Sequence, residues 1–176
     1  ANDVATAVYQ GADAVMLSAE SAVGRHPTAA VAIMDRIIRA IETDRAANPS
    51  AQAAPGTAEP PPAAACARAA AKLADDLDCP LVVFTRSGSS AQRVSATRPR
   101  QPIHALTPSL PTARKLSLVW GVSADLEPEE PKSFDDILDA VSRHEAASNV
   151  KRFVITAGYP YASDNSTDTI KVVERK

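Results

Sequence analysis

The decapeptide Leu81-Val-Val-Phe-Thr-Arg-Ser-Gly-Ser-Ser90 joins a short apolar run to a cluster of hydroxyl side chains. The apolar run predicts a strand over 81–85 that is buried on both faces, as in a parallel sheet. Serine residues that follow a glycine are typical of the start of a helix, which we expect over 89–97. A buried strand followed directly by a helix predicts an α/β fold.

The same alternation continues on both sides of this stretch. An alanine-rich helix is predicted before it, over 63–77. After it, the pattern predicts a strand over 103–107, a helix over 111–118, a strand over 121–126, a helix over 134–147, and strands over 152–156 and 169–174. Strands that alternate with helices imply right-handed crossovers, and hence a three-layer α/β/α domain with a mostly parallel sheet. The last two strands lack an intervening helix, so we expect them to form an antiparallel edge.

Residues 46–62 have the composition of a linker, because they combine five prolines with alanine and small polar residues. They divide the chain into a first part over 1–45 and a domain over 63–176. The first part opens with a helix that we expect to be capped by Asn2 or Asp3 and ended by Gly11.

A strand over 14–17 is predicted next, followed by a second helix that begins at Pro27 and ends near Asp44. A buried strand needs neighbouring strands, and the residues before this one supply only one short helix. We therefore expect the sequence to open in the middle of a fold. The apolar residues that recur at helical spacing along the second helix, and should face a core, are Val31, Met34, Ile37, Ile38 and Ile41.

Composition argues against several classes of protein. No apolar run approaches the roughly 20 residues that span a bilayer, and no secretory signal is recognisable. The two cysteines and three histidines are scattered without the spacing of metal ligands. We therefore expect a cytoplasmic protein with reduced cysteines, no metal site and no contact with membranes.

The segment between Cys79 and Ala124 carries six basic residues and no acidic one. It lacks the stacking aromatic residues of a nucleic-acid-binding surface, so we expect no nucleic acid partner. A compact site for a small phosphorylated anion fits this segment better. The alternative is a solvated basic face.

The stretch Gly-Ala-Asp-Ala-Val-Met-Leu-Ser-Ala-Glu-Ser-Ala-Val-Gly over 11–24 resembles the Gly-Ala-Asp-x-x-Met-Leu-Ser-Gly-Glu-Thr-Ala-x-Gly motif of the pyruvate kinase family. Ala19 stands where the family has glycine, and Ser21 stands where it has threonine. The resemblance covers essentially the whole chain. Four later stretches resemble the C-terminal domain of that family, in the same order: 85–91, 98–103, 113–122 and 154–160.

The resemblance implies that residues 1–45 are the last strand–helix unit of a catalytic (β/α)8 barrel, and that residues 63–176 form the C-terminal domain. The intact enzyme would transfer phosphate from phosphoenolpyruvate to ADP in glycolysis, giving pyruvate and ATP, with Mg²⁺ and K⁺. It would be a cytoplasmic homotetramer under allosteric control. The family's metal-binding and nucleotide-binding residues belong to earlier barrel strands. We therefore expect this chain alone to be inactive and to bind neither cation.

Ser18 and Glu20 match family positions that line the active site at the end of the last barrel strand. A hydroxyl and a carboxylate there could hold water and relay a proton to the enolate formed from phosphoenolpyruvate. The alternative is that both are ordinary exposed loop residues in this chain.

The residues that follow the strand over 81–85 have the chemistry of a phosphate site. Backbone N–H groups at a helix start favour anions, a glycine lets the backbone approach closely, and an arginine binds oxygens in bidentate fashion. The corresponding loop of pyruvate kinases holds the phosphate of an allosteric sugar phosphate. The alternative is a serine-rich cap that binds water or an adventitious anion. The candidate effector-binding residues are Thr85, Arg86, Ser87, Gly88, Ser89 and Ser90.

Two features oppose a bisphosphate effector. The loop over 158–168 carries Asp164 and Asp168, which would repel a nearby phosphate. The segment over 125–132 is acidic, and no Trp–Arg pair of the kind that grips the second phosphate of fructose 1,6-bisphosphate follows it. A monophosphate effector, or none, is expected.

Two other functions stay open on the sequence. The chain could be a free-standing sensor of phosphorylated metabolites that uses residues 85–90. It could also be a purely structural assembly domain whose alanine-rich helix and C-terminal strand make subunit contacts.

Overall fold

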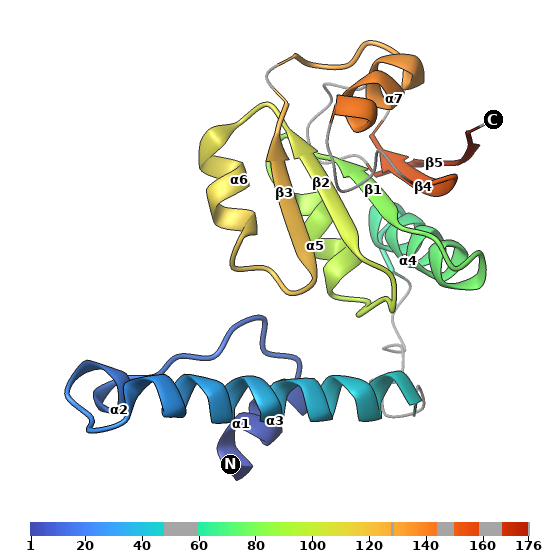
Figure 1. Ribbon diagram of the computed structural model, residues 1–176. Coiled ribbons are helices and arrows are strands. Elements are labelled where there is room, and N and C mark those ends of the chain that lie inside the picture. The colour runs from blue at the N-terminus through green and yellow to red at the C-terminus, as the bar shows by residue number, and fades with distance from the viewer. Residues whose placement is uncertain (48–59, 128, 144–149, 159–166, 176) are drawn as a thin grey trace. The chain divides into compact units, whose positions relative to one another are not determined.

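A computed structural model describes residues 1–47, 60–127, 129–143, 150–158 and 167–175 (Figure 1). The chain divides into two compact units, Ala1–Ala58 and Glu59–Lys176, each of which is described by itself. Most of the predicted linker lies outside the described residues, as do Asp164 and the predicted end of the helix over 134–147.

The first unit is helical in its described residues. It contains α1 (Asn2–Tyr9), α2 (Ala19–Ala22) and α3 (Pro27–Ala47). The first helical residue of α1 is Asn2, so its N-cap is Ala1, which makes no side-chain hydrogen bond. The predicted cap at Asn2 or Asp3 is therefore wrong.

The end of α1 is where the sequence predicts it. Gly11 has a φ of 87°, in the left-handed region where a Cβ is disfavoured. The Gly11 N–H donates to the Val8 carbonyl, and the Ala12 N–H donates to the Ala7 carbonyl. This pair of bonds satisfies carbonyls of the last helical turn and stops the helix.

The predicted strand over 14–17 does not form. These residues have no regular secondary structure, and Met16 is 85% exposed. The backbone N–H and C=O groups of a strand need a neighbouring strand, and none is present among residues 1–47.

The core expected along α3 is also incomplete. Val31 is exposed, and only partial burial is reached by Met34, Ile37, Ile38 and Ile41.

The second unit confirms the predicted α/β fold. Its five-stranded sheet has the order β3-β2-β1-β4-β5. The first four strands in that order pair in parallel, and β5 pairs with β4 in antiparallel fashion at the edge. The strands are β1 (Leu81–Phe84), β2 (Ile103–Thr107), β3 (Val122–Leu126), β4 (Arg152–Ala157) and β5 (Thr169–Glu174). The helices are α4 (Pro62–Asp76), α5 (Ser89–Ser95), α6 (Leu110–Leu116) and α7 (Phe134–Arg143).

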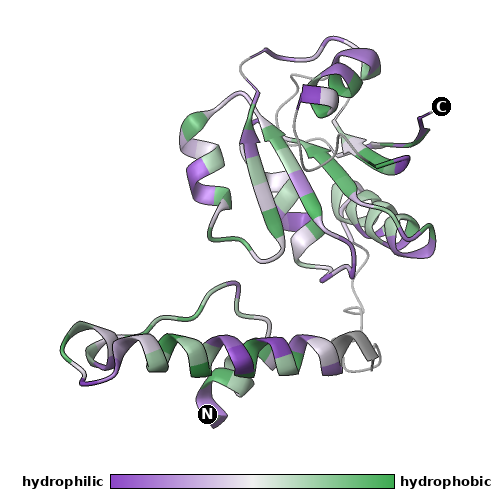
Figure 2. Ribbon diagram, viewed as in Figure 1, coloured by the Kyte–Doolittle hydropathy of each residue, from purple (hydrophilic) through white to green (hydrophobic). Residues whose placement is uncertain are grey.

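Two hydrophobic clusters cover the two faces of the sheet and give the three layers. Leu81 and Val83 of β1 belong to the cluster that includes α4, α5 and Leu116 of α6. Val82 and Phe84 belong to the other cluster, which packs against α7. Successive side chains of a strand point to opposite faces, so a strand covered on both sides must be apolar throughout. Figure 2 shows this hydrophobic colouring along the whole of β1.

The alanine-rich composition of α4 has a packing role. The residues of α4 that are buried are all alanines, namely Ala67, Ala70, Ala71 and Ala74. Their small side chains let the helix lie close to the sheet, where all four belong to the same buried cluster as Leu81 and Val83.

His104 is a polar side chain placed on the otherwise apolar surface of β2. It lies in register with Val82 of β1 and Ser123 of β3. Its Nδ1 atom is buried and makes no hydrogen bond within the described part of the chain. Burial lowers the pKa of His104, and the nearby Asp125 opposes this shift only in part.

We expect His104 to make folding sensitive to mild acid. Because its folded-state pKa is depressed, protonation favours the unfolded chain, so the free energy of unfolding falls as the pH drops below about 6.5. Urea unfolding can be followed by the fluorescence of the single tryptophan, Trp120. Between pH 7 and pH 5, the free energy of unfolding should fall less in His104→Leu than in the wild type. The exposed His26 provides the control variant His26→Asn. Parallel pH profiles for all three proteins would contradict this role.

Candidate functional site

The loop over 85–90 leaves β1 at its carboxyl end and enters α5. Thr85 is buried; its N–H donates to the Leu106 carbonyl at 3.0 Å, and its Oγ1 accepts from the Gly88 N–H at 3.0 Å. Gly88 is the N-cap of α5, with a φ of 88°. A Cβ at this position would lie 3.3 Å from side-chain atoms of Thr112 and Leu116. The tight turn therefore requires glycine both for its backbone angle and for its space.

The outward part of the loop consists of Arg86, Ser87 and Ser89. Arg86 and Ser87 are exposed, and Ser89 is partly exposed. The Ser87 hydroxyl donates to the Ser89 hydroxyl at 3.1 Å, so the two oxygens lie side by side. The Arg86 carbonyl accepts a hydrogen bond from Thr112 Oγ1 at 2.9 Å, which ties the loop to α6. These are the side chains of the loop that a ligand could reach directly.

Ser90 is placed differently from the other predicted site residues. It is buried, and its Oγ lies 2.6 Å from Oγ1 of Thr167, itself 1% exposed. A buried hydroxyl that has lost its partner is costly, so this pair stabilises the junction between α5 and the residues before β5. The six candidates thus divide into three that present side chains and three that shape the loop: Thr85, Gly88 and Ser90.

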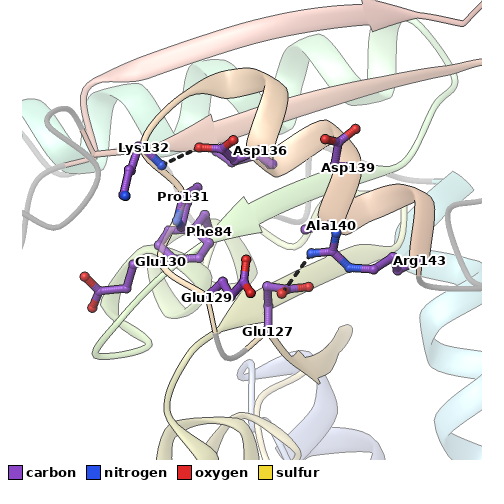
Figure 3. A pocket seen from close by; sticks show the side chains of 11 residues that line it. Phe84, Glu127, Glu129, Glu130, Pro131, Lys132, Asp136, Asp139, Ala140 and Arg143 are labelled. Atoms are coloured by element: carbon purple, nitrogen blue, oxygen red, sulfur yellow. Dashed lines mark hydrogen bonds and ion pairs between the residues drawn. The ribbon is translucent and has the colours of Figure 1, made fainter.

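A pocket of about 210 Å³ lies at the same edge of the sheet (Figure 3). It is formed by the end of β1, the segment after β3 and one face of α7. Its charged residues are five carboxylates and two cations, namely Glu127, Glu129, Glu130, Asp136, Asp139, Lys132 and Arg143. Figure 3 shows Glu127 reaching Arg143 of α7, whereas the Glu130 side chain, on the same segment after β3, points away from that helix. The pocket is therefore acidic, although the basic segment between Cys79 and Ala124 comes directly before the residues that form most of it.

The carboxylates of α7 in this pocket were not among the sequence candidates. The sequence argument uses the acidic segment over 125–132 only as a feature that opposes a bisphosphate effector. The missed signal is the spacing of Asp136, Asp139 and Arg143, which places them on one face of a helix. That face lines the pocket together with the segment after β3, which leads directly into the helix.

The segment that carries the pocket glutamates is fixed at its start. The Glu127 N–H donates to the Thr107 carbonyl at 2.9 Å, which extends the pairing of β3 with β2 by one residue. The Glu127 carboxylate is buried and accepts from Arg143 Nη2 at 2.9 Å. A buried charge needs such a partner to offset its lost hydration.

The same segment is fixed at its end by the cap of α7. Ser133 Oγ accepts from the Asp136 N–H at 3.2 Å, and the Asp136 carboxylate accepts from the Ser133 N–H at 2.9 Å and the Lys132 N–H at 2.7 Å. This reciprocal arrangement is a capping box with aspartate in the usual glutamate position. The hydrogen bond from the Lys132 N–H, followed by those from Ser133, holds the pKa of Asp136 below its usual value.

Ser18 and Glu20 lie together in the first unit, where both are exposed. Glu20 Oε2 accepts from the Ser18 N–H at 3.0 Å. Hydrogen bonds from its own N–H and from that of Ser18 lower the pKa of Glu20. Because the strand over 14–17 is absent, these residues stand at the start of α2 and not at the end of a strand, which corrects the sequence expectation.

The described residues do not supply a metal site. Nowhere among them do three His, Cys, Asp or Glu side chains converge in a way that could hold a metal ion. The helices in the described ranges are all too short or too polar to cross a membrane.

Comparison with known proteins assigns the chain to a family. The sequence profile described as pyruvate kinase, alpha/beta domain, matches residues 64–173, which is more than half of the chain. The chain belongs to the pyruvate kinase family. The profile ends close to the last residue of β5, so it spans the whole sheet of the second unit.

Individual pyruvate kinases extend the likeness to both units. One from Agrobacterium vitis is 46% identical over 180 residues, covering 99% of this chain and 37% of the relative. Pyruvate kinase 2 of Synechocystis sp. is 38% identical over 175 residues, covering 97% and 29%. The crystal structure of a pyruvate kinase from Cryptosporidium parvum matches with a TM-score of 0.76 at 28% identity, covering 98% and 35%. The chain matches the C-terminal part of pyruvate kinase and spans about a third of the length of these relatives.

The capping box of this pyruvate kinase domain yields a pH-dependent prediction. The folded-state pKa of Asp136 is depressed, so its stabilisation is present above the unfolded pKa, about 3.9, and is lost as the pH falls through the folded value. At pH 7, Asp136→Asn should therefore unfold at a lower urea concentration than the wild type. The difference between the two unfolding midpoints should narrow below pH 4. Asp135→Asn, at the neighbouring position of the same turn, is the control. An equal effect of both substitutions at every pH would refute the assignment.

Proposed function

We propose that this chain is the C-terminal, regulatory part of a pyruvate kinase. The intact enzyme would transfer the phosphoryl group of phosphoenolpyruvate to ADP, giving pyruvate and ATP in glycolysis. It would act as a cytoplasmic homotetramer with Mg²⁺ and K⁺. The observation that carries the proposal is the match of residues 64–173 to the pyruvate kinase alpha/beta domain, within relatives about three times as long.

The chain alone would not catalyse this reaction. Phosphoryl transfer needs a divalent cation, cationic groups on the transferred phosphate and a positioned acid. The described residues offer no donor set for such a cation. Ser18 and Glu20 would line the active site of the intact enzyme, holding water that relays a proton to the enolate. Both are exposed to solvent, and no strand is present among residues 1–47 to shield that step.

The 176-residue chain should therefore give no pyruvate above the blank with phosphoenolpyruvate, ADP, Mg²⁺ and K⁺ in an assay coupled to lactate dehydrogenase. A matched assay of a complete pyruvate kinase provides the positive control. Clear turnover by the chain that disappears in Glu20→Gln would show that it contains a working active site.

We also propose that residues 85–90 bind the phosphate of a small effector. Arg86, Ser87 and Ser89 present a guanidinium and two adjacent hydroxyls at the carboxyl end of β1, where open α/β sheets bind ligands. Gly88 allows a close backbone approach at the start of α5. The carboxylates of the adjacent pocket would repel a second phosphate, so the effector class is a monophosphate ester.

Calorimetric titration tests this site. The wild-type chain should bind glucose 6-phosphate, and Arg86→Ala should weaken binding about tenfold, since a charge-assisted hydrogen bond contributes about 1.5 kcal/mol. Arg100→Ala removes the same charge before the amino end of β2, where Arg100 contacts Asp75, and should leave the affinity within about twofold. Fructose 1,6-bisphosphate should bind no more tightly than the monophosphate. Equal losses in both variants would point to a general charge effect and not to a site.

A further inference from the structure

The guanidinium of Arg86 is already engaged by a carboxylate of the chain itself. Its Nη2 lies 2.6 Å from Oε1 of Glu130. Glu130 belongs to the segment after β3 and lines the acidic pocket, so the contact joins the loop over 85–90 to that pocket. A carboxylate and a phosphate use the same donors of an arginine, with similar geometry. An anion that uses the donors of Nη2 must therefore displace the Glu130 oxygen, and one that uses the other donors shares the guanidinium with Glu130.

The backbones on both sides of this ion pair are held independently of it. On one side, the Arg86 carbonyl is bonded to Thr112, and Gly88 is bonded to Thr85. On the other, the segment carrying Glu130 is anchored at Glu127 and by the capping box of α7. Breaking the pair therefore requires only side-chain rotation. The loop can keep its shape while one anion replaces another.

The exposure of the pair sets the strength of this competition. The Arg86 side chain is 49% exposed and that of Glu130 is 38% exposed. Ion pairs at this level of exposure are weak, because water and salt screen them. Such a pair lowers the affinity for an external anion without preventing its binding.

We infer that Glu130 is an internal competitor for the anion site at Arg86 and that it sets which ligands this site accepts. The inference rests on the proposed phosphate site and adds its selectivity. The segment that carries Glu130 also carries Glu127 and Glu129, so a displaced Glu130 carboxylate adds to the negative charge on that side of the site. The ligand must therefore bring one phosphate to Arg86 and present a neutral or cationic remainder to the pocket. A phosphate monoester of a sugar or amino sugar has this chemistry, and a bisphosphate does not.

The test compares two neighbouring glutamates. The 176-residue chain and its variants Glu130→Gln and Glu129→Gln are titrated calorimetrically with glucose 6-phosphate and inorganic phosphate at constant ionic strength. Glu129 lines the same pocket, so Glu129→Gln removes an equal charge from almost the same place. Glu130→Gln should bind both probes about two- to fivefold more tightly than the wild type. Glu129→Gln should show a smaller gain. In the Arg86→Ala background, Glu130→Gln should give no gain beyond that of Glu129→Gln.

Each alternative result has a distinct meaning. Equal gains in the two glutamine variants would show that Glu130 acts only through the general field, and the inference would be overturned while the phosphate site stands. A gain that persists in full without Arg86 would overturn it in the same way. If no protein, including Glu130→Gln, binds either probe, the phosphate site and its competitor both fail. Circular dichroism of each variant confirms that the fold is unchanged.

Discussion

The burial of β1 on both faces is the constraint on which the second unit depends. Leu81 and Val83 pack toward α4 and α5, while Val82 and Phe84 pack toward α7. The strand lies in the centre of the sheet, with β2 on one side and β4 on the other. Its residues can leave water only if helices cover both faces, so one apolar tetrapeptide requires three layers. The strand also ends at the edge of the sheet where the loop over 85–90 and the acidic pocket lie.

Opposite charges meet at that edge because of the topology. The basic segment carries six positive charges, and the acidic segment over 125–132 that follows it carries four carboxylates and one lysine. Parallel strands bring the residues after β1 and after β3 to the same edge, where Arg86 contacts Glu130. The arrangement gives the proposed anion site a cation that is partly neutralised. It also gives the site a neighbouring space whose charge opposes any second anionic group.

The first unit separates what local sequence determines from what needs neighbouring strands. Gly11 ends α1, and Pro27 begins α3, as expected from the conformational preferences of these residues alone. The strand over 14–17 needs hydrogen bonds from other strands, and Met16 is instead exposed. The hydrophobic side chains of α3 likewise remain partly uncovered. Local signals are sufficient for helix ends, whereas a parallel strand exists only as part of a sheet.

The sequence by itself determined the succession of helices and strands in the second unit, the mostly parallel sheet and its antiparallel edge. It did so because hydrophobic period and turn residues are local properties that the sheet reinforces. It also located the loop over 85–90, through Gly88 and the serines around it. Only the tertiary structure decided the roles within that loop, burying Ser90 against Thr167 and pairing Arg86 with Glu130. These contacts join residues far apart in the chain. The periodicity and spacing of residues within one segment do not predict which distant side chains will contact each other.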